Sequence, residues 1–228
     1  MSINDKKRLL NYIHRSRGNI LDMLDTRSYN TKKYRNFSYE TLTSVYEKHE
    51  QGKYGTLAEL SPLDIKVNSK VNDSKIIVKY RLDEKFKNTA SLKKLVGLIY
   101  EEHQLTENDT LIILVVNAIL PKPNNYENTV FSFTEEFRIQ KRFVQVYGLE
   151  NHLINISKHE FVPKHNILSD SEIQEVCNKY NIVKENLHRI LSQDPMAKFL
   201  GLRIGQVVKV NSCNPIVGYT PSYKVCVI

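Results

Sequence analysis

The stretch that decides the fold of the C-terminal third reads DPMAKFLGLRIGQVVKV, from Asp194 to Val210. The Asp194 carboxylate is placed to accept the unpaired amide hydrogens at a helix start, and Pro195 is tolerated in the first turn. Gly201 is placed to end that helix, and Gly205 permits a tight entry into a strand. Because valines dominate the end of the stretch, it predicts a short helix, a turn and a strand in succession.

Around this stretch, the sequence predicts a compact α+β domain over residues 151–228. Ser169 and Glu172 form a capping-box pattern that opens a helix, whose buried face we assign to Ile173, Val176, Cys177 and Tyr180. A second short helix is predicted over 184–191. Phe161 to His165 is expected to be an extended connector. Strands are predicted at Gln206–Val210 and Tyr223–Val227, joined by a loop that contains Pro215, Gly218 and Pro221.

Residues 1–150 predict a separate α/β domain, because helical and strand patterns alternate along them. Helices are expected over 5–24, over 38–50 with Ser38 as cap, from Asn88 or Thr89 onward, and over 133–142. A hairpin is expected between 63–67 and 76–82, with a turn at Asn72–Ser74. Thr110–Ala118 is almost wholly apolar, as in a strand that is covered on both faces. Short strands are predicted at Val144–Tyr147 and Leu153–Ile156.

Composition and charge narrow the function classes. No apolar run approaches the roughly 20 residues of a membrane helix, and no apolar signal core follows the basic residues near the N-terminus. Three cysteines without paired spacing predict reduced thiols in an intracellular protein. The net charge is +8, and residues 1–35 hold nine Lys or Arg against three Asp or Glu. This charge favours nucleic acid as a partner, although a composition rich in Lys, Asn and Ile produces basic surfaces without selection for binding.

Three stretches in order carry a resemblance to a known family: INISKHEFVPKH at 154–165, DPMAKFLG at 194–201 and GQVVKV at 205–210. The segment from Ile154 to Lys224 thereby resembles the assembly domain of RNA polymerase subunit 5, which archaea have as a free-standing small protein. The resemblance implies docking on the largest polymerase subunit. It makes the following residues candidates for that interface: His159, Pro163, His165, Asp194, Pro195, Lys198, Arg203 and Gln206. Residues 211–219 depart from the family pattern, which is usually charged there.

The N-terminal 150 residues match this family only in the order of predicted elements. In the family this part is a nuclease-like α/β jaw domain beside the downstream DNA duplex, without nuclease activity. By position, Leu120-Pro121-Lys122-Pro123 corresponds to a proline-containing loop that approaches DNA. The resemblance therefore makes Lys122 a candidate phosphate contact. The excess of basic residues near the N-terminus makes Lys6, Lys7 and Arg8 further candidates. The alternative for residues 120–123 is a surface loop made polar by two prolines.

Catalytic and metal chemistry is not indicated. A nuclease of the related fold needs an acidic residue two positions before a lysine, whereas Lys79 follows Ile77 and Val78, and Asp64 is the only nearby strand acid. His159, His165 and the cysteines lack the paired spacing of a zinc site, and no phosphate-binding glycine loop occurs. We therefore predict no catalytic residues, no metal and no cofactor.

These observations lead to one hypothesis: a non-catalytic subunit of a multisubunit DNA-directed RNA polymerase. Its expected partners are the largest subunit, the rest of the polymerase core and downstream duplex DNA, with no membrane and no homo-oligomer. Such a protein belongs in the nucleus if cellular, and in the virion or host cytoplasm if it comes from a large DNA virus. Two alternatives stay open: a nuclease-derived DNA-processing enzyme, and a free DNA-binding regulatory protein with a borrowed assembly domain.

Overall fold

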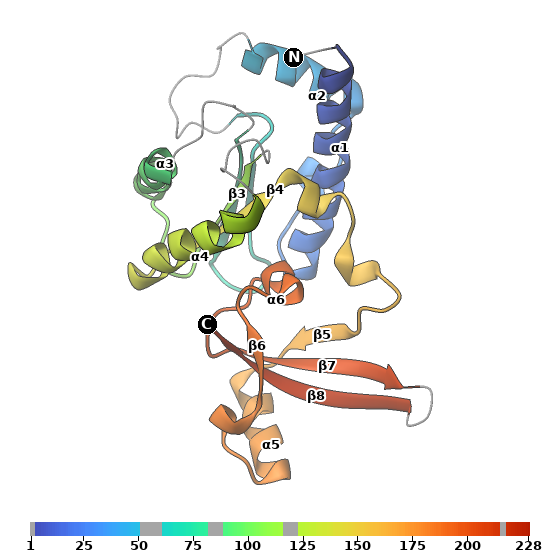
Figure 1. Cartoon of the computed structure of the whole chain (residues 1–228), viewed down its shortest axis with the longest axis vertical. Coiled ribbons are helices and arrows are strands. Elements are labelled where there is room, and N and C mark those ends of the chain that lie inside the picture. Colours follow the sequence, from blue (N-terminus) through green and yellow to red (C-terminus); the bar gives the residue numbers. More distant parts are fainter. Residues whose placement is uncertain (1–2, 51–60, 82–88, 116–122, 215–217) are drawn as a thin grey trace. The chain divides into compact units, whose positions relative to one another are not determined.

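The computed structural model describes residues 3–50, 61–81, 89–115, 123–214 and 218–228 (Figure 1). The chain divides into two compact units, Met1–Ile154 and Asn155–Ile228. Each unit has one four-stranded sheet of its own. The protein is thus a mixed α/β molecule in which helices accompany two separate sheets.

The first unit is built on a sheet in the order β1-β2-β3-β4. Its strands are β1 (Ile65–Asn68), β2 (Lys75–Arg81), β3 (Thr110–Val115) and β4 (Phe143–Gly148). β1 runs antiparallel to β2, while β2, β3 and β4 are parallel. Every residue of β3 is buried, because this strand has a neighbour at each edge and cover on each face.

Helices cover both faces of this sheet. α3 (Thr89–Glu102) and α4 (Pro123–Ile139) pack on one face, in a core cluster that includes Ile99, Phe133 and Ile113. α1 (Ile3–Thr26) lies on the opposite side of the sheet, with α2 (Tyr39–Glu50) beside it (Figure 1). The parallel strands are therefore joined by helical crossovers, as parallel pairing requires.

Most elements predicted in this unit are confirmed, and two predictions are wrong. Ser38 Oγ accepts the Thr41 amide at 3.1 Å and so caps α2 as expected. α4 begins at Pro123, well before the predicted residue 133, because proline is compatible with a first helical turn. Leu153–Ile156 is not a strand. Short 3-10 helices, Leu149–His152 and Ile156–Lys158, occupy this region, and the Asn155 side chain caps the second one.

The second unit has a sheet in the order β5-β7-β8-β6. Its strands are β5 (Lys164–Ile167), β6 (His188–Leu191), β7 (Val207–Asn214) and β8 (Gly218–Val227). β6 is parallel to β8, and the other pairs are antiparallel. α5 (Asp170–Tyr180) packs on the sheet through a cluster of Ile173, Leu187, Val207 and Val225, and α6 (Pro195–Leu200) precedes β7.

Four predictions for this unit need correction. Residues 184–191 form a 3-10 turn (Lys184–Asn186) and then β6, because the backbone of β6 pairs with β8. Of the predicted extended connector Phe161–His165, Phe161 and Val162 lie in a turn, and the chain then enters β5 at Lys164, which pairs with β7. The predicted strands are too short: β7 continues past Val210 to Asn214 and β8 begins at Gly218, so that Pro221 lies opposite Asn211 in the sheet. Tyr180 is 46% exposed and rests against Tyr223 at a ring-centroid distance of 6.0 Å, so it is not part of the buried face.

No helix among the described residues combines the length and the apolar character needed to cross a bilayer.

Candidate subunit-docking site

α6 is held at both ends by the residues that the sequence singled out. Asp194 Oδ1 accepts the amides of Met196 at 2.7 Å and Ala197 at 3.2 Å, which satisfies two of the unpaired donors at the helix start. Gly201 adopts the left-handed conformation at φ 68°, and its amide donates to carbonyls in the last turn. Pro195 occupies the first helical position and is exposed. A helix of six residues is thereby given a fixed start and a fixed end.

The turn after α6 is bonded to the end of β8. The Arg203 amide donates to Gln206 Oε1 at 2.8 Å, and Gly205 takes a φ of 85°. The Gly205 amide donates to the Cys226 carbonyl at 2.9 Å, and the Cys226 amide donates to the Gln206 carbonyl at 2.8 Å. Burial, with a smaller effect of the Asp194 carboxylate, raises the pKa of the Cys226 thiol. Asp194 and Gln206 therefore both lie close to Cys226.

The segment that enters the second unit contains the remaining interface candidates. His159 and Phe161 rings lie 5.8 Å apart, and the Phe161 amide donates to His159 Nδ1 at 3.3 Å. Phe161 is nevertheless 85% exposed. His165 Nδ1 lies 2.6 Å from the Pro163 carbonyl oxygen, which fixes Nδ1–H as the donor, and His165 pairs with Val210 in the sheet.

The structure divides the eight candidates into two groups. Asp194, Arg203 and Gln206 lie near the end of β8. Pro195 and the half-buried Lys198 are on α6, which packs against the 3-10 helix Ile156–Lys158. His159, Pro163 and His165 follow that 3-10 helix along the entry segment. The two groups are therefore connected through α6, which packs against the 3-10 helix at the start of the entry segment.

Sequence reasoning missed the exposed apolar residues of this region. Phe161, Ile167 and Ile204 all have exposed side chains. Ile204 also borders a hollow of about 370 Å³ between the start of α5 and Gly205–Gln206. The available signal was the apolar pair Phe161-Val162 in a segment predicted to be a connector, where polar residues are the rule.

Of the four predicted DNA contacts, Lys6, Lys7 and Arg8 lie in the first turns of α1. Lys6 lies 3.9 Å from Glu47 and over the Tyr46 ring, and Arg8 Nε donates to the Tyr12 hydroxyl at 3.0 Å. Lys7 is exposed on the same turn of α1. Lys122 lies outside the described residues, and its phosphate contact stays a prediction.

Among the described residues, the acid that pairs with Lys79 is Asp64, which directly precedes β1 and serves the fold. Asp64 Oδ2 lies 2.8 Å from Lys79 Nζ, and both side chains are almost fully buried. Asp64 also accepts the amides of Tyr80 at 2.8 Å and Ser61 at 2.7 Å. No acid stands next to Lys79 in the sequence, and only the pairing of neighbouring strands brings the two together. Within the described part of the chain, no group of three His, Cys, Asp or Glu side chains could hold a metal ion.

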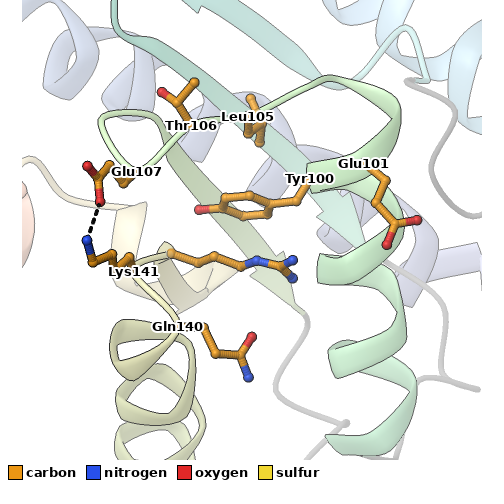
Figure 2. A pocket seen from close by; sticks show the side chains of 8 residues that line it. Tyr100, Glu101, Leu105, Thr106, Glu107, Gln140 and Lys141 are labelled. Atoms are coloured by element: carbon orange, nitrogen blue, oxygen red, sulfur yellow. Dashed lines mark ion pairs between the residues drawn. The ribbon is translucent and has the colours of Figure 1, made fainter.

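A second hollow, of about 360 Å³, lies between the ends of α3 and α4 (Figure 2). Lys141 Nζ and Glu107 form an ion pair of 3.5 Å at its border, and the Arg142 guanidinium lies 5.0 Å from the centre of the Tyr100 ring. Its opposite charges are thus partly paired with each other, which is typical of a solvated surface concavity.

Comparison with known proteins matches the second unit. The family described as RNA polymerase Rpb5, C-terminal domain, matches residues 154–226. DNA-directed RNA polymerase subunit Rpo5 of Methanosarcina mazei is 41% identical over 69 residues, which are 30% of this chain and 88% of the relative.

Relatives from eukaryotes align over more of the chain. DNA-directed RNA polymerases IV and V subunit 5B of Arabidopsis thaliana is 34% identical over 104 residues, or 46% of this chain and 44% of the relative. The rpabc1 subunit of RNA polymerases I, II and III of Dictyostelium discoideum is 29% identical over 136 residues, or 60% of this chain and 64% of the relative. The alignments span less than two thirds of these two relatives. The archaeal protein, in contrast, is matched over most of its length, and the chain therefore belongs to the RNA polymerase subunit 5 family, whose members are non-catalytic subunits of RNA polymerases.

Proposed function

We propose that the protein is a non-catalytic subunit of a DNA-directed RNA polymerase. In this proposal the second unit docks on the largest subunit, and the first unit acts as a jaw beside downstream DNA. The carrying observation is that the family match at 154–226 coincides with a compact unit, Asn155–Ile228. A domain that has its own sheet and core is suited to bind as a preformed module.

The exposed apolar residues of the second unit support docking by this domain. Stable interfaces need a desolvated apolar or aromatic centre surrounded by polar groups. Phe161 and Ile204 supply exposed apolar area, and the interface candidates His159, Arg203 and Gln206 supply polar groups beside them. The capped α6 and the bonded turn hold part of this surface in place before binding, which lowers the entropy lost on association.

The first unit supports a role beside DNA without hydrolysis. Lys7 is exposed at the start of α1, and the +8 charge of the chain attracts phosphate. Asp64, which pairs with Lys79 of β2, is buried and also accepts two backbone amides, so it is engaged in holding the fold. As a polymerase subunit, the protein belongs in the nucleus if its polymerase is cellular, and in the virion or host cytoplasm if it is viral.

Affinity purification of the tagged full chain at moderate salt, followed by mass spectrometry, tests the assignment. We expect the two large polymerase subunits in fixed ratio to the chain. Recovery of the chain alone, or with repair factors, would refute the assignment.

Matched variants test the docking surface separately. Phe161→Glu with Ile204→Glu places two charges on the exposed apolar area and should lower recovery of the large subunits. Val71→Glu adds a charge at an 81% exposed apolar position in the first unit and should leave recovery unchanged. Normal recovery with the double variant would move the docking surface elsewhere while the subunit assignment stands.

A further inference from the structure

The outer edge of β1 is covered by the segment that follows α1. The Tyr34 hydroxyl donates to the Lys66 carbonyl at 3.0 Å and accepts the Lys66 amide at 3.1 Å. The Asn30 amide donates to the Asn68 carbonyl at 3.1 Å, and the Lys70 amide donates to the Ser28 carbonyl at 2.9 Å. These contacts satisfy the backbone groups that an edge strand otherwise leaves open, and they fix residues 28–34 along β1.

This arrangement gathers cations from two distant parts of the sequence. Lys32 and Lys33 come from the covering segment, and Lys66 comes from β1 itself, where it points away from the buried face. We call these three residues the β1-edge lysines. All three are exposed, and no carboxylate among the described residues lies within ion-pair distance of them.

The nearby acids are engaged by other cations. Arg35 forms ion pairs with Asp22 at 2.9 Å and Asp25 at 2.5 Å, and Lys70 lies 3.6 Å from Asp25. Burial acts to raise the pKa of Asp25, but hydrogen bonds from Arg35 and Thr31 outweigh it and hold this pKa below its ordinary value. The charges of the β1-edge lysines therefore remain uncompensated at this edge of the sheet.

The chemistry of this surface favours a phosphate backbone over a protein partner. Lysine is depleted in protein–protein interfaces, which need an apolar centre, whereas nucleic-acid interfaces are strongly positive. The β1-edge lysines have one exposed large apolar residue in the adjoining turn, Val71. The Tyr34 ring is not offered to a base, because Arg17 and Lys33 lie 5.9 and 5.8 Å from its centre. Contact would therefore be with phosphates and would not depend on the base sequence of the DNA.

We propose that the β1-edge lysines form a binding surface for the phosphate backbone of duplex DNA. This surface is separate from the basic cluster at residues 6–8. α1 has 24 residues and rises about 1.5 Å per residue, so its two ends are roughly 35 Å apart, and the covering segment follows the far end. The inference rests on the proposed role of the first unit beside DNA and adds a contact surface to it. It can be tested without assembly into a polymerase, because all of its residues belong to the first unit, so its failure is distinguishable from failure of the subunit assignment.

Fluorescence anisotropy with the full chain and a labelled 20-base-pair DNA duplex (about two helical turns) tests the proposal across a salt series. The variant Lys32→Gln/Lys33→Gln/Lys66→Gln removes the three charges and leaves the backbone contacts of Lys66 with Tyr34 in place. The control Lys48→Gln/Lys94→Gln/Lys179→Gln removes the same formal charge from three exposed lysines elsewhere. Circular dichroism and thermal unfolding confirm that each variant is folded.

The edge variant should bind the duplex at least about tenfold more weakly at low salt, and its plot of log affinity against log salt should be shallower by about 2–3. The control should stay close to the unaltered chain. Equal weakening by both variants, or no duplex binding by the unaltered chain at low salt, would overturn the proposal. So would a loss of polyglutamate binding by the edge variant with duplex binding unchanged, because the surface would then serve an acidic protein.

Discussion

Replacing Asp194 by alanine tests whether the short helix α6 depends on its cap. The substitution removes the acceptor of two amide hydrogen bonds, at 2.7 and 3.2 Å. Loss of an N-cap costs about 0.5–2 kcal/mol. Asp194 is half-buried and its hydrogen bonds are charge-assisted, so we expect a cost in the upper part of this range, about 1.5 kcal/mol.

The assay must report on the second unit alone, because two units need not unfold together. The chain has no tryptophan, so peptide-resolved amide hydrogen exchange in a urea series is the suitable probe. With a urea dependence of about 1 kcal/mol/M for a domain of this size, the midpoint for peptides of the second unit should fall by about 1.5 M.

Two controls separate the cap from other effects. Asp194→Asn keeps a side-chain acceptor and should cost only a few tenths of a kcal/mol. Gln193→Ala removes an exposed side chain one position earlier and should have no effect. A midpoint for Asp194→Ala within about 0.2 M of the unaltered chain would refute the reasoning. An equal loss in Asp194→Asn would show that the charge matters and the acceptor does not.

Four further predictions rest on the contacts of single side chains. Lys79→Met leaves the buried Asp64 carboxylate without its cation and should lower the free energy of unfolding of the first unit by about 3–5 kcal/mol. Adding Asp64→Asn to the same chain removes the unpaired charge and should recover part of this loss. Urea denaturation measures both effects. Burial, with Arg27 nearby, lowers the pKa of His152 from 6.5 to about 4. The first unit should therefore lose up to about 3 kcal/mol of stability as the pH falls through this range, because the unfolded chain binds the proton more readily. In denaturation experiments at several pH values, His152→Phe should make the stability of the first unit less dependent on pH. Gly201→Ala forces an alanine to φ 68° and should cost about 1 kcal/mol in the same exchange assay, and an unchanged midpoint would show that this conformation is not strained for alanine. Neutralising Lys6, Lys7 and Arg8 should make DNA retention by the purified polymerase less sensitive to salt. The slope of log affinity against log salt should become shallower by about 2–3. An unaltered slope would show that these three residues are solvated and do not contact DNA.

Local signals in the sequence were sufficient wherever a few neighbouring residues determine the backbone. The capping box at Ser169 and Glu172 forms as predicted, with the Ser169 amide 2.7 Å from the Glu172 carboxylate. The start of α6 at Asp194 and its end at Gly201 were also predicted correctly. Each of these features depends on contacts within a few positions, so it is visible in the sequence whatever the rest of the chain does.

The candidate docking site was only partly accessible from sequence. The roles of Asp194 and Gly201 followed from local chemistry, but the bonding of the Gly205–Gln206 turn to Cys226 joins residues that are far apart in the chain. Likewise, the apolar pair Phe161-Val162 in a predicted connector was a signal of special use, but it did not decide whether Phe161 is buried or exposed, because an apolar residue in a connector is compatible with both.

By itself, the sequence determined the helix caps, the buried strand β3, the absence of the nuclease acid–lysine spacing and the resemblance to the polymerase subunit family. Only the tertiary structure decided that residues 164–167 and 188–191 are strands, that Asp64 neutralises Lys79, and that lysines from two segments meet at the edge of β1. The physical reason is the range of the interactions. A helix end is stabilised by its own neighbours, whereas a strand, a buried ion pair or a charged surface depends on partners that the fold brings from elsewhere in the chain.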